Sequence, residues 1–245
     1  MATGGVMAKF VMVHGGGHGG WCWQRLAPLL RAGGHDVYTP TLTGLGERAH
    51  LLNAAIDLDT HITDIVAVLK YEDLSEVILV GHSYGGMVIT GVADRALSRI
   101  GHLVFLDAAH PKNAEALVQT SPGLMEFARK SARIVDGCEL VMWPSTEVVE
   151  MMGVVEPKDA AWLLDKLTPH PWKCFAQPLR LAHEAQVRMI PFTNINASWS
   201  MKVRPPESIR RATEGERVWE IDTGHDLMIT EPQAVAALLS KVANL

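Results

Sequence analysis

The sequence predicts a doubly wound α/β fold with a mostly parallel sheet, interrupted by a helical cap. Short apolar runs, such as VILV at 77–80, alternate with segments whose apolar residues recur at helical spacing. A continuous apolar run is typical of a strand that is buried on both faces. Because the connections are short, the alternation favours right-handed βαβ units and a parallel sheet.

The first half of the chain is expected to alternate regularly between strands and helices. Strands are predicted at 10–14, 35–40, 77–80 and 102–106, and helices at 23–32, 59–69 and 85–97. The first helix stops at Gly33-Gly34, a helix-ending signal, and Asp59 or Thr60 would cap the second.

The alternation breaks after Asp107. Residues 109–186 contain helical patches at 115–118, 125–132 and 159–167, several prolines and no clear strand. A strand at 188–192, ended by Pro191, a strand at 217–221 and a helix at 231–243 then restore the pattern. We therefore expect residues 1–245 to form one domain, with 109–186 as a helical cap over the carboxyl ends of the strands.

Composition and charge exclude several classes of function. The 245 residues are 48% hydrophobic and 20% charged, and the net charge of −5 does not favour binding to nucleic acid. No apolar run approaches the roughly 18 residues of a membrane span, and no signal peptide is predicted. Three cysteines form neither a disulfide framework nor a zinc pattern. We expect a cytoplasmic protein with reduced thiols.

The stretch Gly81-His-Ser83-Tyr-Gly85 follows the strand at 77–80 and precedes a helix. In this context G-x-S-x-G places a serine on a strained strand-to-helix turn, with the N–H of the next residue facing a bound oxygen. The flanking glycines are needed because so tight a turn leaves no room for Cβ atoms. A chance Gly/Ser turn is the alternative, but the strand before it and the helix after it favour Ser83 as a nucleophile.

The glycine-rich loop HGGGHGG at 14–20 follows the first strand. A serine that attacks a carbonyl needs at least two donors aimed at the developing oxyanion. We predict that these donors are the N–H groups of Gly16 and Tyr84, since glycines allow the backbone to approach the substrate closely.

Other interpretations of this loop fail in detail. It lacks the Gly-Lys-Ser/Thr ending of a phosphate-binding P-loop. Gly15-x-Gly17-x-x-Gly20 is a nominal dinucleotide fingerprint, but the next strand ends without the expected acidic residue. Zinc binding by His14 and His18 lacks a third ligand at a sensible spacing, and a hydrogen bond within the loop is the expected role of His18. No metal or cofactor is therefore predicted.

The loop Thr-Gly-His225-Asp226 lies between the last strand and the last helix. A histidine at this place fits the order nucleophile, acid, histidine, and would act as general base toward Ser83 and then as general acid. His82 flanks the serine and is expected to point away from the substrate.

The acid that orients His225 is less obvious. The stretch after the predicted strand at 188–192 offers Asn194 and Asn196 but no carboxylate, and an amide cannot stabilise imidazolium charge as a carboxylate does. Asp107 ends the predicted strand at 102–106, the next strand after the one that precedes Ser83. Its carboxylate could reach the imidazole of His225, although it could instead cap its own loop. We favour Asp107 over the two asparagines. Asp222 and Asp226 are expected to diverge from the ring of His225.

Taken together, HGGGHGGWCW, TLTGLGERAHLL, GHSYGG, LDAAHP and TGHD resemble the α/β-hydrolase superfamily. More narrowly, they resemble its branch of plant methylesterases, salicylate-binding esterases, hydroxynitrile lyases and small bacterial esterases. The resemblance spans nearly the whole chain and is weakest across 112–185. It implies a cofactor-free Ser–His–acid enzyme whose cap is inserted after the sixth strand of that fold. In related haloalkane dehalogenases the acid can follow this earlier strand, which supports Asp107.

Two departures separate the chain from the lyases of that branch. Those lyases carry Thr or Asn where this chain has Gly15, and the rubber-tree type carries a cyanide-binding lysine where this chain has Asp226, whose charge would repel cyanide. An esterase is therefore favoured, and a hydroxynitrile lyase is the alternative. A ligand receptor with slow or no turnover is a third interpretation, which an intact Ser83–His225 pair disfavours.

The prediction is a serine esterase that cleaves a small, mostly apolar carboxylic ester, carbamate or amide through an acyl-enzyme. Its partners would be that small molecule and, at most, a second copy of the chain in a homodimer, with no nucleic acid and no membrane. The residues expected to line its pocket are Gly17, Trp21, Met125, Phe127, Trp143, Trp162 and Trp172. For each side chain, ordinary packing between cap and sheet is an equally good explanation.

Overall fold

A six-stranded parallel sheet forms the centre of the protein in the computed structural model, which describes residues 7–215 and 217–245. The strand order is β2-β1-β3-β4-β8-β9, so that the chain winds outward in both directions from β1 and β3. The strands are β1 (Lys9–Val13), β2 (Asp36–Tyr38), β3 (Val77–His82), β4 (Ile100–Leu106), β8 (Phe192–Ala197) and β9 (Val218–Ile221).

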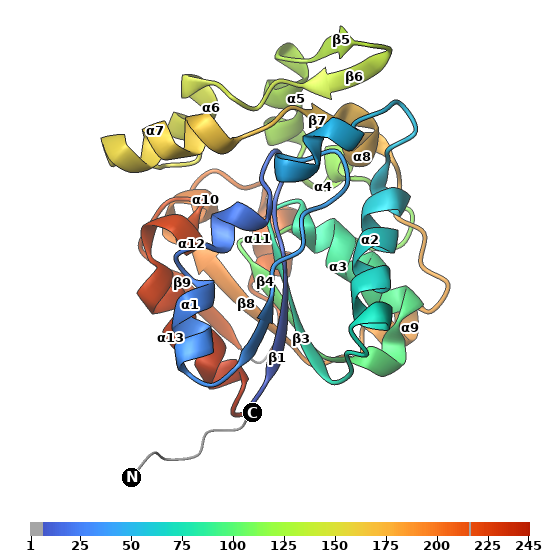
Figure 1. The fold of residues 1–245 in the computed structure, drawn as a ribbon, viewed down its shortest axis with the longest axis vertical. Coiled ribbons are helices and arrows are strands. Elements are labelled where there is room, and N and C mark those ends of the chain that lie inside the picture. Colours follow the sequence, from blue (N-terminus) through green and yellow to red (C-terminus); the bar gives the residue numbers. More distant parts are fainter. Residues whose placement is uncertain (1–6, 216) are drawn as a thin grey trace.

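Helices cover both faces of this sheet (Figure 1). On one face lie α1 (Ala27–Ala32), α12 (Leu227–Thr230) and α13 (Pro232–Val242), and on the other lie α2 (Leu58–Tyr71), α3 (Gly85–Arg95) and α9 (Glu184–Val187). Two further helices, α10 (Ser198–Met201) and α11 (Pro206–Ala212), follow β8. Within the described ranges, no helix has both the length and the apolar character to cross a membrane.

Most of the segment 109–186 stands above the carboxyl ends of the strands (Figure 1). Its helices there are α4 (Leu117–Thr120), α5 (Pro122–Lys130), α6 (Thr146–Met151), α7 (Pro157–Lys166) and α8 (Trp172–Ala176). The expectation that this segment holds no strand is wrong, because β5 (Arg133–Val135), β6 (Cys138–Val141) and β7 (His170–Pro171) form a small antiparallel sheet. Asp136-Gly137, with φ of 49° and 77°, makes the two-residue hairpin turn between β5 and β6.

The strand predicted at 188–192 is also misplaced along the chain, because the observed strand β8 spans Phe192–Ala197. Pro191 comes just before β8 rather than at its end, and the stretch taken for the following loop, which contains Asn194 and Asn196, is the strand itself. Its alternation of small polar and apolar residues is buried on both faces, which conceals the strand from a search for apolar runs. The carboxyl end of β8 therefore lies at Ala197.

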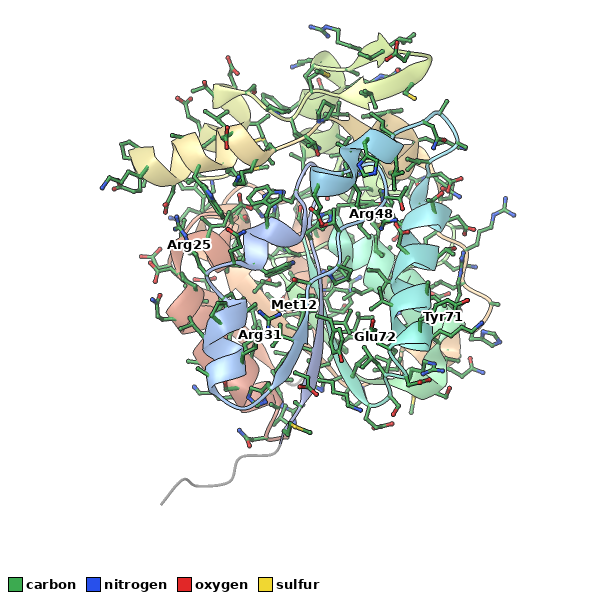
Figure 2. All side chains as sticks on the ribbon, viewed as in Figure 1. Met12, Arg25, Arg31, Arg48, Tyr71 and Glu72 are labelled. Atoms are coloured by element: carbon green, nitrogen blue, oxygen red, sulfur yellow. The ribbon has the colours of Figure 1, made fainter. Side chains whose placement is uncertain are left out.

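The hydrophobic core lies along the central strands. Figure 2 shows Met12 of β1 within the molecule, and its side chain is fully buried. Tyr71, at the end of α2, lies toward the edge of the molecule in the same view and is 78% exposed. The continuous apolar runs of β1, β3 and β4 are thus buried on both sides, as parallel strands between two helical layers require.

The buried histidines carry a consequence for stability. Burial is the main cause that lowers the pKa of His14 and His82 to about 3, and that of His61 and His102 to about 4. The pKa of His170 is also well below its usual value, for the same reason. These rings are neutral in the folded protein at pH values where the unfolded chain binds protons.

The start of α2 is the best-defined helix cap. Asp57 accepts hydrogen bonds from the N–H (3.0 Å) and Oγ1 (2.9 Å) of Thr60, and its own N–H donates to Thr60 Oγ1. Replacing Asp57 with alanine should lower the free energy of unfolding by about 1 kcal/mol. For a chain of this size the midpoint of thermal unfolding should fall by about 2–4 °C. An unchanged midpoint would contradict this role of the cap.

Acid should destabilise the protein well before its carboxylates titrate. A depressed histidine pKa favours the folded state above pH 6.5, and that advantage is lost as the pH falls toward the folded pKa, at about 1.4 kcal/mol per pH unit for each ring. His18 opposes this trend, because its raised pKa means that the folded protein binds a proton there more readily than the unfolded chain does. Thermal unfolding measured from pH 7 to pH 5 should show a steadily falling midpoint, less steep in His102→Gln. A midpoint independent of pH would contradict the buried neutral rings.

Candidate active site

Ser83 lies on a sharp turn between β3 and α3. Its φ of 54° is in the left-handed region, which a residue with a Cβ rarely adopts. The glycines beside it allow the turn, because a Cβ on Gly81 would lie 2.7 Å from the carbonyl oxygen of Gly85, and a Cβ on Gly85 would lie 2.7 Å from that of Val13. The strained turn holds the Ser83 hydroxyl at a cavity under the cap.

This cavity has a volume of about 420 Å³ and a mostly apolar wall. The apolar residues around it are Leu117, Leu124, Met125, Phe127, Trp143, Met151, Met152, Phe175, Trp199 and Val203. The polar residues that line it include Ser83, Asp107, Ser200, Arg204 and His225. Met125, Phe127 and Trp143 are residues that the sequence suggested for the pocket. The other apolar residues of the wall come from the cap and from the segment after β8, and no sequence motif marks their positions.

Four of the residues expected in the pocket do not line this cavity. Trp21 stacks on His18, with ring centroids 5.4 Å apart, and meets Trp162 edge to face at 5.2 Å. Trp172 packs edge-on against Phe175. Gly17 lies beneath Trp143 and is hydrogen-bonded to the cap. For these positions, packing between cap and sheet is the better explanation.

His225 lies after β9, and its Nδ1 is 2.5 Å from Oδ2 of Asp107. Nδ1 donates this hydrogen bond, which leaves Nε2 of the neutral ring free to accept a proton. The two asparagines considered for the same role bond elsewhere. The amide of Asn194 contacts His110 and the carbonyl of Glu214, and Nδ2 of Asn196 donates to the carbonyl of Ala212.

Asp107 is fully buried and lies directly after β4 with a φ of 46°. Besides His225, it accepts hydrogen bonds from Ser200 Oγ (2.5 Å), Arg204 (2.8 Å) and the N–H of Ala197 (3.2 Å). Burial by itself would raise the pKa of Asp107, but the Arg204 guanidinium and the bonds from His225 and Ser200 hold it well below its usual value. The carboxylate therefore stays ionised.

Ser200 was missed by the sequence analysis. It sits on α10, just beyond β8, where the acid was first sought, and its Oγ is also 3.4 Å from His225 Nδ1. Ser200 was overlooked because the end of β8 was predicted too early in the sequence. With the strand ending at Ala197, residues 198–200 follow it directly and are the place to look for such a side chain. A serine here cannot replace a carboxylate, but it can hold the one supplied by β4.

The glycine loop presents an N–H to the same cavity. Gly16 and Tyr84 both line it, and within the described residues neither of their N–H groups donates to a protein acceptor. The carbonyl of Gly15 accepts a hydrogen bond from His14 Nδ1 (2.9 Å), and that of Gly16 accepts one from His18 Nδ1 (2.9 Å). The peptide groups around Gly16 are thus fixed while its own N–H stays available.

His18 forms a buried ion pair with Asp226. Its Nε2 lies 3.3 Å from Asp226 Oδ2 and its Nδ1 donates to Gly16, so both ring nitrogens are donors and the ring is charged. Burial would lower the pKa of His18, but Asp226 raises it, and His18 in turn lowers the pKa of Asp226 to about 2. Asp226 binds His18 rather than His225, but the expectation that it diverges from the ring of His225 is wrong, because its carboxylate lies within 4.8 Å of a His225 ring nitrogen. Asp222 accepts a hydrogen bond from Ser198.

His82 lies directly against the site. Its ring centroid is 4.7 Å from that of His225, and its Nε2 donates to the backbone carbonyl of His225 at 3.0 Å. It is fully buried and does not line the cavity. His82 therefore supports the backbone of the loop that carries His225.

Among residues 7–215 and 217–245, two clusters contain side chains of types that can bind metals. The first is His61, His170 and Cys174, whose ligand atoms lie within 4.8 Å of one another. Nδ1 of His170 accepts the N–H of Gly17, so the neutral ring carries its hydrogen on Nε2 and has no lone pair left for a metal. In the second cluster, His82, His225 and Asp226 are held by the hydrogen bonds and the ion pair already described. Neither donor set favours a metal.

The comparisons with known proteins agree with this architecture. The family model described as "Alpha/beta hydrolase family" matches residues 10–238. The carbendazim hydrolyzing esterase of Nocardioides sp. (strain SG-4G) is 36% identical to this chain over an alignment of 246 positions, which covers 96% of this chain and 99% of that protein.

Two solved structures share the fold over nearly their whole length. A methylesterase from Arabidopsis has a TM-score of 0.77 at 23% identity and covers 98% of this chain and 100% of its own. An extracellular alpha/beta-hydrolase from a Paenibacillus species has the same TM-score and identity, with coverage of 96% and 98%. From the family match and the full-length relative, the chain belongs to the alpha/beta hydrolase family.

Proposed function

We propose that this protein is a serine esterase in which Ser83, His225 and Asp107 act as nucleophile, base and acid. The observation that carries the proposal is the 2.5 Å hydrogen bond between His225 Nδ1 and a buried, ionised Asp107, at the wall of the cavity that Ser83 also lines. That bond fixes the tautomer that a general base needs.

The proposed reaction proceeds through an acyl-enzyme. Nε2 of His225 takes the proton of Ser83 as its Oγ attacks the ester carbonyl, and then gives this proton to the leaving alcohol. The free N–H groups of Gly16 and Tyr84 are suited to hold the oxyanion. Water then enters, His225 takes its proton, and hydrolysis of the acyl group restores Ser83. No cofactor takes part in this scheme.

The proposed substrate is a small, mostly apolar ester or an ester-like carbamate. A cavity of about 420 Å³ with an apolar wall suits a molecule of that kind, since binding sites for small ligands usually span about 300–1,000 Å³. The name of the Nocardioides relative adds support, because that protein is called an esterase and is said to hydrolyse carbendazim, a small molecule.

A lyase remains the alternative reaction, but the position after His225 does not favour it. Asp226 is completely buried, paired with His18 and absent from the wall of the cavity. The charge of Asp226 is thus balanced by His18 and does not repel cyanide as the sequence suggested, but this position provides no cation for a departing cyanide.

Ser83→Ala tests the nucleophile. The wild type should release p-nitrophenol from a short acyl ester with an initial burst. The variant should show no burst, and its kcat should fall about 10⁵–10⁶-fold, because no acyl-enzyme can form. Mandelonitrile is the control substrate. Release of cyanide from it, without ester hydrolysis, would favour the lyase instead, and tight binding without turnover of either substrate would favour a receptor.

Asp107→Asn tests the acid against its two rivals. Loss of the carboxylate should lower kcat by about 10³–10⁴-fold with little change in KM, because the imidazolium then loses its stabilising charge. Asn194→Ala and Asn196→Ala should keep most of the activity, since their side chains bond to groups outside the cavity. If Asp107→Asn keeps most of its activity, the assignment of the acid is wrong.

A further inference from the structure

The segment 168–170 of the cap is hydrogen-bonded to both polar groups of Gly17, the residue next to the proposed oxyanion donor. The N–H of Gly17 donates to Nδ1 of His170 at 3.1 Å. Its carbonyl accepts from the N–H of Thr168 at 2.8 Å and from Oγ1 of Thr168 at 3.3 Å. The cap thus contacts the loop by directional bonds and not only by packing.

These bonds fix the plane of the peptide that follows Gly16. One end of this peptide, the Gly16 carbonyl, is held by His18, and the other end, the Gly17 N–H, is held by His170. Gly17 has a φ of 74°, and the indole of Trp143 leaves no space above it, since a Cβ there would lie 2.9 Å from Trp143 Cγ. The Gly16 N–H belongs to the preceding peptide, whose Gly15 carbonyl accepts from His14 Nδ1, and the two peptides meet at the Cα of Gly16. A shift of Gly17 would therefore displace the Gly16 N–H.

His170 is itself held rigidly and stays an acceptor. Its ring stacks on Phe175, with centroids 4.3 Å apart and planes within 13°. It also meets the ring of Tyr84 edge to face at 5.0 Å, so it contacts the residue that carries the second proposed oxyanion donor. Complete burial keeps the pKa of the ring low, which preserves the lone pair on Nδ1.

We propose that His170 is a positioning residue for the oxyanion hole, so that the cap helps to build the catalytic site as well as cover it. The inference rests on the proposed function and deepens it. Through Gly17, His170 holds the Cα of Gly16 and so helps to place the Gly16 N–H, and through the ring of Tyr84 it packs against the residue that carries the other donor.

The test compares His170→Phe, which keeps a ring against Phe175 but removes the acceptor, with His102→Phe, which removes a buried histidine of β4 whose Nε2 is hydrogen-bonded to Thr193. His170→Phe should lower kcat about 10–100-fold, part of the 10²–10³-fold value of one oxyanion donor, with KM nearly unchanged. Its affinity for an aryl trifluoromethyl ketone, which forms a tetrahedral oxyanion on serine, should fall in parallel. His102→Phe should change neither quantity.

A second pair of variants separates the hydrogen bond from packing. His170→Asn and His170→Leu have similar shape and both lose the stacked ring, but only asparagine keeps an acceptor near the place of Nδ1. The asparagine variant should recover most of kcat and of the ketone affinity relative to leucine. This pair decides the matter if His170→Phe does not fold.

The outcomes distinguish this inference from the proposed function. A wild type without Ser83-dependent hydrolysis would refute the proposed function, and this inference with it. A wild type that hydrolyses esters, together with a folded His170→Phe of unchanged kcat and ketone affinity, would refute this inference alone. Equal activity in the asparagine and leucine variants would do the same.

Discussion

The site depends on one buried charge. The carboxylate of Asp107 is inaccessible to water, and an unpaired charge in such a place is strongly destabilising. The structure compensates it with donors from separate parts of the chain: a backbone N–H at the end of β8, Ser200 on α10, Arg204 and His225. Because each donor must reach the same two oxygens, the ends of β4, β8 and β9 and the segments that follow them are fixed relative to one another.

In the glycine-rich loop, the backbone groups around the Gly16 N–H are held by hydrogen bonds to histidines, while the Gly16 N–H itself is free of any acceptor among the described residues. His14, His18 and His170 each hydrogen-bond one backbone group of the loop, and they do so in different protonation states. His14 and His170 are neutral because they are buried, whereas His18 is charged because Asp226 lies beside it. The Gly16 N–H is left for a ligand. A preorganised donor of this kind needs no rearrangement when charge develops on a substrate.

Most of the fold and the central residues of the site were predictable from local patterns. The apolar runs predicted β1, β3 and β4, and a serine between glycines after β3 predicted the sharp turn that carries Ser83. The errors lie where local patterns are weak. β5 has only three residues, and β8 carries asparagines, so neither reads as an apolar strand. Ser200, the lining of the cavity and the roles of Trp21 and Trp162 depend on contacts between distant segments, and no spacing along the chain encodes these.

By itself, the sequence determined that Ser83 lies on a strained turn and that Ser83 and Asp107 directly follow buried strands, because glycine placement and hydrophobic runs act over a few residues. It also supplied Ser83, His225 and Asp107 as chemical candidates. Only the tertiary structure decided that Asp107, and neither Asn194 nor Asn196, contacts His225, since a side chain's partner depends on how the strands lie side by side. It likewise decided that His14 and His170 are neutral and that His18 is charged, because burial and a nearby carboxylate fix these protonation states and neither is visible along the chain.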